Sequence, residues 1–293
     1  MSRRALSATR AAELLNFLAA HPDEAFSYSQ LSQRLAINLA STHNLLIALT
    51  ECGYLTRSPR DRSFSLGPAL VALGDAALRQ NPMLDEAREQ MRRLSRELGR
   101  ETLAFVRAGP DALCVARSGP ETGPGRTVRV GQRVPLMAPL ASVFVAWAPD
   151  GEVEQWLAHG STPRREHRRQ REILARVRER GYSVALEVAG RRQLGELLAE
   201  LADDPHSDAL RSEMRAVIEE LRVGGYQLDE DGAATHRIST LTAPVFERQG
   251  RVELALTLQV FERGVSARAI EALAAPLLHA ARAIAAADAS AGT

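Results

Sequence analysis

The sequence contains no lysine, and all 37 of its basic residues are arginines. A phosphate-binding loop of the Walker type, a Schiff base and a lysine general base each need a lysine side chain. This absence therefore excludes nucleotide hydrolysis through such a loop and catalysis through a lysine amine.

Metal-binding and nucleophilic side chains are few and scattered. Cys52 and Cys114 lie among apolar residues outside any metal-ligand spacing, so we predict two buried free thiols. Ser142 lacks the glycine-flanked context of a nucleophile elbow. No zinc-ligand spacing relates His159, His167, His206 and His236. We expect no metal, no cofactor and no enzymatic activity.

Long hydrophobic runs are also missing. No stretch of about 18 apolar residues is present, which argues against a membrane span. The first 20 residues include Glu13 and Asn16 among apolar side chains, a pattern typical of an amphipathic helix rather than a secretory signal. We therefore expect a cytoplasmic protein. Its net charge is only +1, so any DNA contact depends on where the arginines lie.

The first 52 residues contain three short helical patterns. Apolar residues recur at helical spacing over residues 9–20, 29–36 and 39–52. The stripe of the third helix that we expect to be buried consists of Leu45, Leu46, Leu49 and Cys52.

A short hairpin and a linker helix follow. Residues 54–57 and 62–66 alternate in the manner of two strands around a turn. Three helices followed by a hairpin predict a winged helix-turn-helix domain over residues 1–68. Residues 69–82 are predicted to form a linker helix that ends at a proline.

The remaining residues, 83–293, combine helices with a mostly antiparallel sheet. Alternating residues over 238–247 and 252–261 predict a hairpin, and a final helix covers 266–287. This combination predicts an α+β domain. Residues 164–180 are rich in arginine, with a few glutamates interleaved, which we interpret as a solvated helix face rather than a nucleic-acid site.

This domain also contains two apolar segments and a pair of similar sequences. Residues 139–147 and 149–158 are apolar and are predicted to be helices. Residues 173–187 and 217–230 echo each other, because both consist of a helix, a Gly-Tyr pair and a short strand. We interpret this echo as two ordinary helix-to-strand connections, and the alternative is an internal duplication.

In order and spacing, these segments resemble the IclR family of bacterial regulators over nearly the whole chain. The N-terminal likeness lies in residues 29–36, 41–46, 49–55 and 64–67. The C-terminal likeness lies in residues 130–136, Gly225-Tyr226, Ala243-Pro244-Val245-Phe246 and the strand 254–258. The resemblance implies a winged helix-turn-helix joined to a GAF-like domain that binds small organic acids or aromatic compounds.

The chain departs from the family pattern at three places. After Pro135-Leu136 the family usually has a histidine and a Gly-x-Gly-Lys-like stretch, where this chain has Met137–Ser142. The family's recognition helix usually carries an arginine where Asn44 stands and a basic residue near Leu39. Residues 188–224 are predicted to be an insertion.

Polar side chains of the recognition helix are expected to face DNA. Asn44 can pair with an adenine edge, and Ala40 or Thr42 can contact a thymine methyl group. The three arginines of the wing can contact phosphates or the minor groove. The predicted DNA-binding residues are Ser29, Ala40, Ser41, Thr42, His43, Asn44, Arg57, Arg60 and Arg62. The alternative for each is a solvated surface residue.

By resemblance, an effector pocket lies between the loop after Pro135 and the C-terminal hairpin. Hydroxyls and backbone N–H groups at a helix start can hold a carboxylate, while apolar neighbours exclude water. The implied effector residues are Leu136, Met137, Leu140, Ala141, Asp229, Ser239, Thr240, Thr257 and Gln259. The alternative is that the polar ones simply alternate outward on a hairpin.

These observations predict a transcription regulator that binds double-stranded DNA and responds to a small-molecule effector. The recognition helix has no arginine, so we expect a homodimer or homotetramer on a (pseudo)palindromic operator. Two alternatives remain open: a winged-helix protein-interaction module without effector, and an enzyme built on the GAF-like domain. Salt-sensitive DNA binding distinguishes the first alternative, and turnover by a protein lacking residues 1–80 would support the second.

Overall fold

The computed structural model describes residues 5–120, 128–225, 228 and 235–290. These residues form two compact units. The smaller unit contains the chain through Gln80 together with Ala199–Arg211, and the larger contains Asn81–Leu198 and the residues from Ser212 onward. The main division of the chain therefore follows Gln80.

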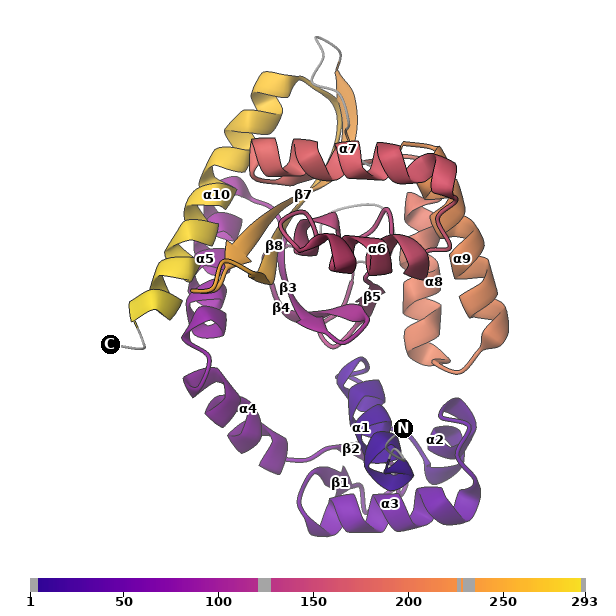
Figure 1. Cartoon of the computed structure of the whole chain (residues 1–293). Coiled ribbons are helices and arrows are strands. Elements are labelled where there is room, and N and C mark those ends of the chain that lie inside the picture. Colours follow the sequence, from indigo (N-terminus) through magenta and orange to yellow (C-terminus); the bar gives the residue numbers. More distant parts are fainter. Residues whose placement is uncertain (1–4, 121–127, 226–227, 229–234, 291–293) are drawn as a thin grey trace. The chain divides into compact units, whose positions relative to one another are not determined.

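The smaller unit is a winged helix-turn-helix. Its elements in chain order are α1 (Leu6–Ala19), α2 (Tyr28–Arg34), α3 (Leu39–Glu51), β1 (Leu55–Arg57), β2 (Phe64–Leu66) and α4 (Ala69–Arg79) (Figure 1). Strands β1 and β2 pair antiparallel, which confirms the predicted hairpin.

One apolar cluster holds the helices and the wing of this unit together. Leu14, Leu18, Leu31, Leu46 and Phe64 are all buried in it. Burying a side chain of this size contributes about 1.5–3 kcal/mol relative to leaving it exposed. Because Phe64 belongs to β2, the cluster that packs the helices also fixes the position of the wing.

Residues Ala199–Arg211 belong to this unit through polar contacts. The Oδ1 atom of Asp203 lies 2.7 Å from Nε2 of His21, the buried residue that follows α1. The backbone oxygen of Asp203 accepts a hydrogen bond from Nη1 of Arg34 at 3.1 Å. Asp203 thus contacts the ends of both α1 and α2.

The larger unit is built on a six-stranded sheet in the order β5-β4-β3-β8-β7-β6, in which every neighbouring pair is antiparallel. The strands are β3 (Thr102–Ala108), β4 (Asp111–Ser118), β5 (Arg133–Pro135), β6 (Ser183–Leu186), β7 (His236–Phe246) and β8 (Val252–Val265). This sheet and its helices confirm the predicted α+β class.

The two faces of the sheet differ in what they contact. On β8, Leu254, Leu256 and Leu258 belong to the core formed with α5 (Pro82–Leu98) and α10 (Ala267–Ser290). Figure 1 shows these two helices side by side along the sheet. Thr257 and Gln259, which occupy the alternate positions of β8, point to the opposite face because successive side chains of a strand alternate. One face is therefore a dry core, and the other can line a cavity.

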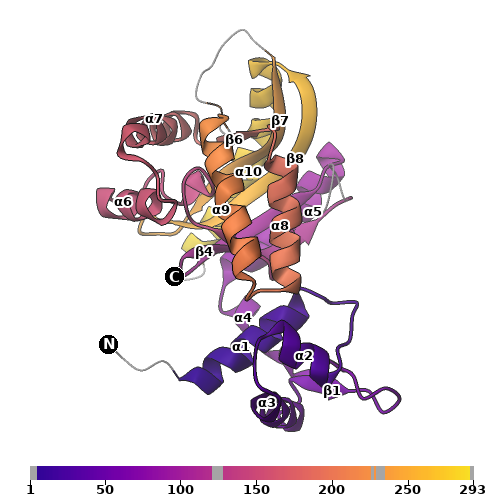
Figure 2. The same cartoon turned by 90° about the vertical axis from the view of Figure 1, so that its right-hand side faces the viewer.

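Shorter elements cover that second face. They are the 3-10 turn η1 (Ser142–Phe144) and the helices α6 (Asp150–His159), α7 (Arg164–Arg180), α8 (Arg191–Asp203) and α9 (Asp208–Val223). Helices α8 and α9 run side by side in both views (Figures 1 and 2). The prediction of a helix over residues 139–147 is wrong, because only three of these residues form a short 3-10 turn.

Helix α10 has the length and composition of a membrane-spanning helix. Its residues Ile270, Leu277 and Ile284 are nevertheless buried in the core with α5 and the sheet. Ordinary packing in this unit therefore explains its apolar composition.

Candidate functional site

Helix α3 turns one face to the core and the other to solvent. Thr42, Leu46 and Leu49 are buried, at the helical spacing i, i+4 and i+7. Ala40, His43 and Asn44 are exposed, and Ser41 is half-buried. The helix therefore presents an imidazole and an amide to solvent on the side away from the core.

The prediction that Thr42 contacts DNA is wrong. Its side chain is wholly buried, and its hydroxyl donates a hydrogen bond to the backbone oxygen of Asn38 at 3.1 Å. The buried stripe is centred on Leu46 rather than Leu45, which is only half-buried. The same rotation leaves Cys52 exposed, so the prediction that both cysteines are buried is wrong for this one.

Helix α2 is fastened to α3 by Tyr28. The phenolic hydroxyl donates a hydrogen bond to the backbone oxygen of Leu39 at 2.8 Å, and the ring meets the His43 ring edge-on at 6.1 Å. Ser29, next to it in the first turn of α2, is exposed. Sequence reasoning missed Tyr28, although an aromatic residue beside the Ser27 helix cap was a usable signal.

A groove lies between α2, α3 and the wing. Its lining includes Ser29, His43, Arg57 and Arg62, four of the residues that the sequence predicts for DNA contact. Tyr28, Ile47 and Asp61 line it as well. The groove thus combines donors, an apolar wall and charges of both signs on the exposed side of the recognition helix, since Glu51 and Asp61 line it beside the two arginines.

All three wing arginines are exposed. The Arg57 guanidinium lies over the Phe64 ring, 5.6 Å from its centroid, so a core residue orients this cation. Arg62 has a φ of 59°, in the left-handed region that an ordinary side chain rarely adopts. Solvated guanidinium groups at a hairpin tip are suited to contact phosphates.

The wing also carries one carboxylate. Hydrogen bonds from the Ser58 and Ser63 side chains lower the pKa of Asp61 from 3.8 to about 2. The Ser63 hydroxyl lies 2.8 Å from its Oδ1 atom. Asp61 is therefore ionised at neutral pH, and it partly offsets the charge of the neighbouring arginines.

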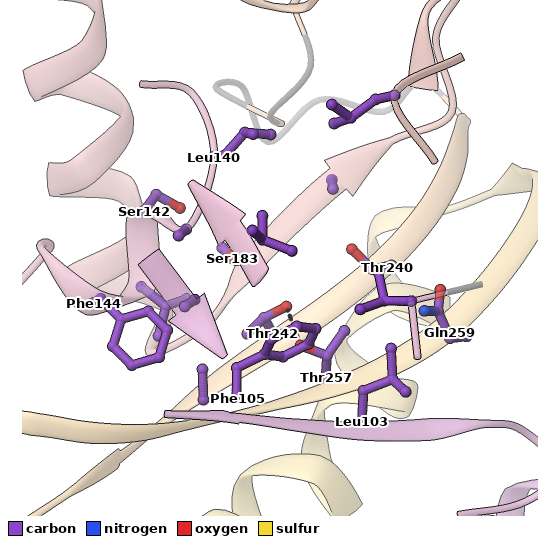
Figure 3. Close-up of a pocket in the computed structure, with 18 of the residues that line it drawn as sticks. Leu103, Phe105, Leu140, Ser142, Phe144, Ser183, Thr240, Thr242, Thr257 and Gln259 are labelled. Atoms are coloured by element: carbon purple, nitrogen blue, oxygen red, sulfur yellow. Dashed lines mark hydrogen bonds between the residues drawn. The ribbon is translucent and has the colours of Figure 1, made fainter. Parts of the chain in front are cut away.

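The larger unit contains a cavity of about 110 Å³. Strands β3, β7 and β8 form its floor, and the loop around η1 and the first half of α8 form its walls. Figure 3 shows Phe105, Leu103 and Leu140 beside hydroxyl-bearing side chains. The cavity can therefore enclose a small, largely apolar molecule that also carries polar groups.

Five of the nine predicted effector residues line this cavity: Leu140, Ala141, Thr240, Thr257 and Gln259. Asp229 lies outside the described residues. The expectation is wrong for the other three. Leu136 packs into the core with α6 and α7, Met137 does not reach the cavity, and the Ser239 hydroxyl donates to the backbone oxygen of Ala185 at 3.1 Å.

Strand register brings the polar residues of the floor together. Thr240 lies opposite Gln259, and Thr242 lies opposite Thr257. The hydroxyls of Thr242 and Thr257 are 3.0 Å apart, and Figure 3 shows this contact. Oε1 of Gln259 is buried with no hydrogen-bond partner in the described structure, so an acceptor is left for a ligand to satisfy.

Hydrogen bonds fix the loop that walls the cavity. Nε1 of Trp156 donates to the backbone oxygen of Leu140 at 2.8 Å, and Nη2 of Arg107 donates to that of Phe144 at 2.9 Å. The loop is thereby held from both the helix α6 and the strand β3. A wall supported in this way is suited to a preformed binding site.

The described residues contain no group of three or more His, Cys, Asp and Glu side chains that could hold a metal ion. Burial raises the pKa of Cys114 to about 12, so this thiol is protonated at neutral pH and a poor nucleophile. The geometry of the larger unit is suited to binding a small molecule.

Two family models match this chain. The IclR helix-turn-helix domain matches residues 7–59, and the C-terminal domain of the bacterial transcriptional regulator IclR matches residues 75–190 and 193–286. Together they cover most of the chain.

Two curated relatives come from Escherichia coli K12. The DNA-binding transcriptional repressor YiaJ is 30% identical over 135 residues, which are 45% of this chain and 48% of that protein. The HTH-type transcriptional regulator KdgR is 28% identical over 162 residues, or 53% of this chain and 61% of that protein. The aligned part thus spans about half to three fifths of these relatives.

Solved structures match over nearly the full length. An IclR transcriptional regulator from Alicyclobacillus acidocaldarius is 20% identical, with a TM-score of 0.69 over 98% of this chain and 100% of that one. An IclR homolog from Microbacterium hydrocarbonoxydans, crystallised with 4-hydroxybenzoate, is 20% identical, with a TM-score of 0.64 over 97% and 99%. At this identity the two structures share the fold.

Proposed function

The chain belongs to the IclR family of bacterial transcriptional regulators, and on that premise we propose that it binds operator DNA and releases or engages it in response to a small-molecule effector. The smaller unit is the DNA-binding part in this proposal, and the larger unit is a GAF-like effector domain. The site of action is the cytoplasm, where the DNA is.

The observation that carries the proposal is the orientation of α3. Leu46 and Leu49 are buried, while His43 and Asn44 are exposed beside a groove that Arg57 and Arg62 also line. An exposed helix of this kind fits the major groove, where an amide can pair bidentately with adenine. Arg57, Arg60 and Arg62 supply the phosphate contacts that hold the helix in register.

The N-terminus of α3 contributes less to phosphate binding than a free helix end would. The side chain of Asn38 already accepts the backbone N–H of Ser41, so this donor is occupied. The affinity of one subunit for DNA therefore depends mainly on the wing. Because the recognition helix has no arginine, one subunit alone binds DNA weakly. This favours an assembly that engages two half-sites at once.

Helix α4 supports such an assembly. It has no buried side chain, and Val71 and Leu73 are 74% and 51% exposed. An amphipathic helix that leaves apolar residues in water is suited to pack against another protein surface. We assign that surface to a second copy of this chain, which gives a homodimer that can pair further into a tetramer.

The cavity of the larger unit supports the effector part of the proposal. Its apolar walls, its threonine hydroxyls and the unpaired oxygen of Gln259 suit a small organic compound with polar substituents. The homolog from Microbacterium hydrocarbonoxydans was crystallised with 4-hydroxybenzoate, a compound of this kind. We therefore propose a small organic acid or aromatic compound as the effector, with no catalytic turnover.

A gel-shift assay tests the proposed function. The full chain is mixed with the DNA upstream of its own gene and, separately, with coding DNA of equal length at several salt concentrations. We expect tighter binding to the upstream DNA, weakening steeply with salt. Equal binding to both DNAs, or none at low salt by a protein shown to be dimeric, would contradict the proposal.

A further inference from the structure

We propose that Arg191 is the counter-ion of the effector and that the cavity of the larger unit selects a singly charged anion, such as a monocarboxylate. This inference rests on the proposed effector function and adds to it the charge of the ligand and the residue that recognises it.

Arg191 is the first residue of α8 and lines the cavity, where it is half-buried. Among the described residues, its Nε atom is buried without a hydrogen-bond partner. A buried donor without a partner is costly. A ligand carboxylate would satisfy it through a charge-assisted hydrogen bond, for which the planar guanidinium group is well suited.

The charge of the lining sets the charge of the ligand. Arg191 is the single charged side chain among the described residues that line the cavity, and the others are apolar or neutral and polar. One negative charge on the ligand would therefore be compensated. A second would be buried without a partner, which is strongly unfavourable. The lining thus favours a monoanion over both a neutral compound and a dianion.

Volume and hydrogen bonding narrow the class further. The cavity measures about 110 Å³, and a cavity of about 150 Å³ in another protein holds benzene. Because this cavity is smaller, it limits the ligand to at most about one ring or a chain of similar size. The unpaired Oε1 atom of Gln259 requires a donor, which a hydroxyl or an N–H group on the ligand can provide.

Arg191 falls in a short break in the match to the family's C-terminal domain. The two segments that match the family's C-terminal domain end at residue 190 and resume at residue 193. We therefore infer that this counter-ion belongs to this chain and sets its effector preference.

Isothermal titration calorimetry of the full chain tests the inference with defined probes. These are 4-hydroxybenzoate, benzoate and hexanoate, the amide of each, and terephthalate as a dianion. For at least one carboxylate and its amide, we expect the carboxylate to bind about 10-fold or more tightly. A hydrogen bond to a charged group contributes enough binding free energy for this difference in affinity. Terephthalate should bind more weakly than benzoate.

Three variants then assign the effect to one side chain. Arg191→Gln should bind carboxylate and amide equally, and Arg191→Lys should retain part of the preference because it keeps the charge. Arg192→Gln is the matched control, since Arg192 is exposed on the next position of α8 and does not line the cavity. It should behave as the unsubstituted protein.

Several outcomes would overturn the inference. They are an unchanged carboxylate preference in Arg191→Gln, amides that bind as tightly as their carboxylates, and no binding of any monocarboxylate in the set. The carboxylate and amide comparison in the unsubstituted protein stands even if Arg191→Gln fails to fold. DNA binding measured without probe tests the proposed function separately, so the two failures are distinguishable.

Discussion

The Oδ1 atom of Asn38 lies 2.9 Å from the backbone nitrogen of Ser41 and closes the N-terminus of the recognition helix. This cap satisfies one of the N–H groups that the first turn of a helix leaves unpaired. It also fixes where α3 begins, and hence which side chains face away from the core.

Replacing this cap should destabilise the smaller unit. We expect Asn38→Ala to lower the free energy of unfolding by about 1 kcal/mol, because the N–H of Ser41 loses its partner. Urea denaturation followed by circular dichroism measures this change. Asn44→Ala is the matched control on the exposed face of the same helix and should leave stability within about 0.5 kcal/mol. Equal stability of both variants would show that the cap is unimportant.

The wing arginines should contribute charge rather than base recognition. Arg57→Gln and Arg60→Gln are each expected to weaken binding to all DNA sequences alike. Each should also reduce the slope of log K against log salt by about 0.9, as expected for one lost phosphate contact. Fluorescence anisotropy at four salt concentrations gives the slopes.

The control for the wing is Arg178→Gln, which removes an exposed arginine of α7 in the larger unit. Its slope should equal that of the unsubstituted protein. If Arg178→Gln changes the slope as much as the wing variants do, the arginines act through overall charge and the wing has no specific role.

The Asp61 carboxylate should titrate at unusually low pH. Its pKa is lowered from 3.8 to about 2 by hydrogen bonds in which Ser58 and Ser63 are the donors. The stabilisation that these bonds provide is therefore fully present above about pH 4 and is lost as the pH falls through 2. NMR titration of the side chain should show the low midpoint, and Ser63→Ala should raise it towards 3.8. A midpoint near 3.8 before substitution would contradict the assigned contacts.

The exposed face of α4 should mediate self-association. We expect Val71→Arg to shift the protein towards monomer, because it places a charge in a surface that we propose to be buried between two copies. Light scattering after size exclusion measures the mass. Asp23→Arg, at an exposed position of the smaller unit outside α4, is the control. A monomeric unsubstituted protein, or an unaffected Val71→Arg dimer, would refute this role of α4.

The sequence predicted the site residues on strands and those on the recognition helix with different success, because side chains repeat every two residues along a strand and every 3.6 along a helix. The resemblance implied Thr240, Thr257 and Gln259, and all three line the cavity. It also implied Ser239, which strand alternation would have excluded, because neighbours on a strand point to opposite faces. In the recognition helix the adjacent Leu45 and Leu46 left the direction of the core ambiguous by about 100°. That ambiguity explains why Thr42 was expected to be exposed and Cys52 to be buried.

The remaining cavity residues could not be predicted from local pattern. Arg191 lies at least 45 residues away in sequence from every strand of the floor, and it reaches the cavity only because α8 packs there. The loop at Met137–Ser142 departs from the family's pattern, so resemblance could not show which of its side chains point inward. Both placements depend on tertiary packing, which no spacing of residues along the chain reveals.

The account as a whole rests on the exposed face of α3, and one binding measurement tests it most directly. Anisotropy of labelled upstream DNA is compared for the full chain and for the double variant His43→Ala with Asn44→Ala. We predict at least about 10-fold weaker binding by the variant, as expected for the loss of a base contact, with unchanged unfolding. A folded variant that binds this DNA with the original affinity and preference would contradict the account.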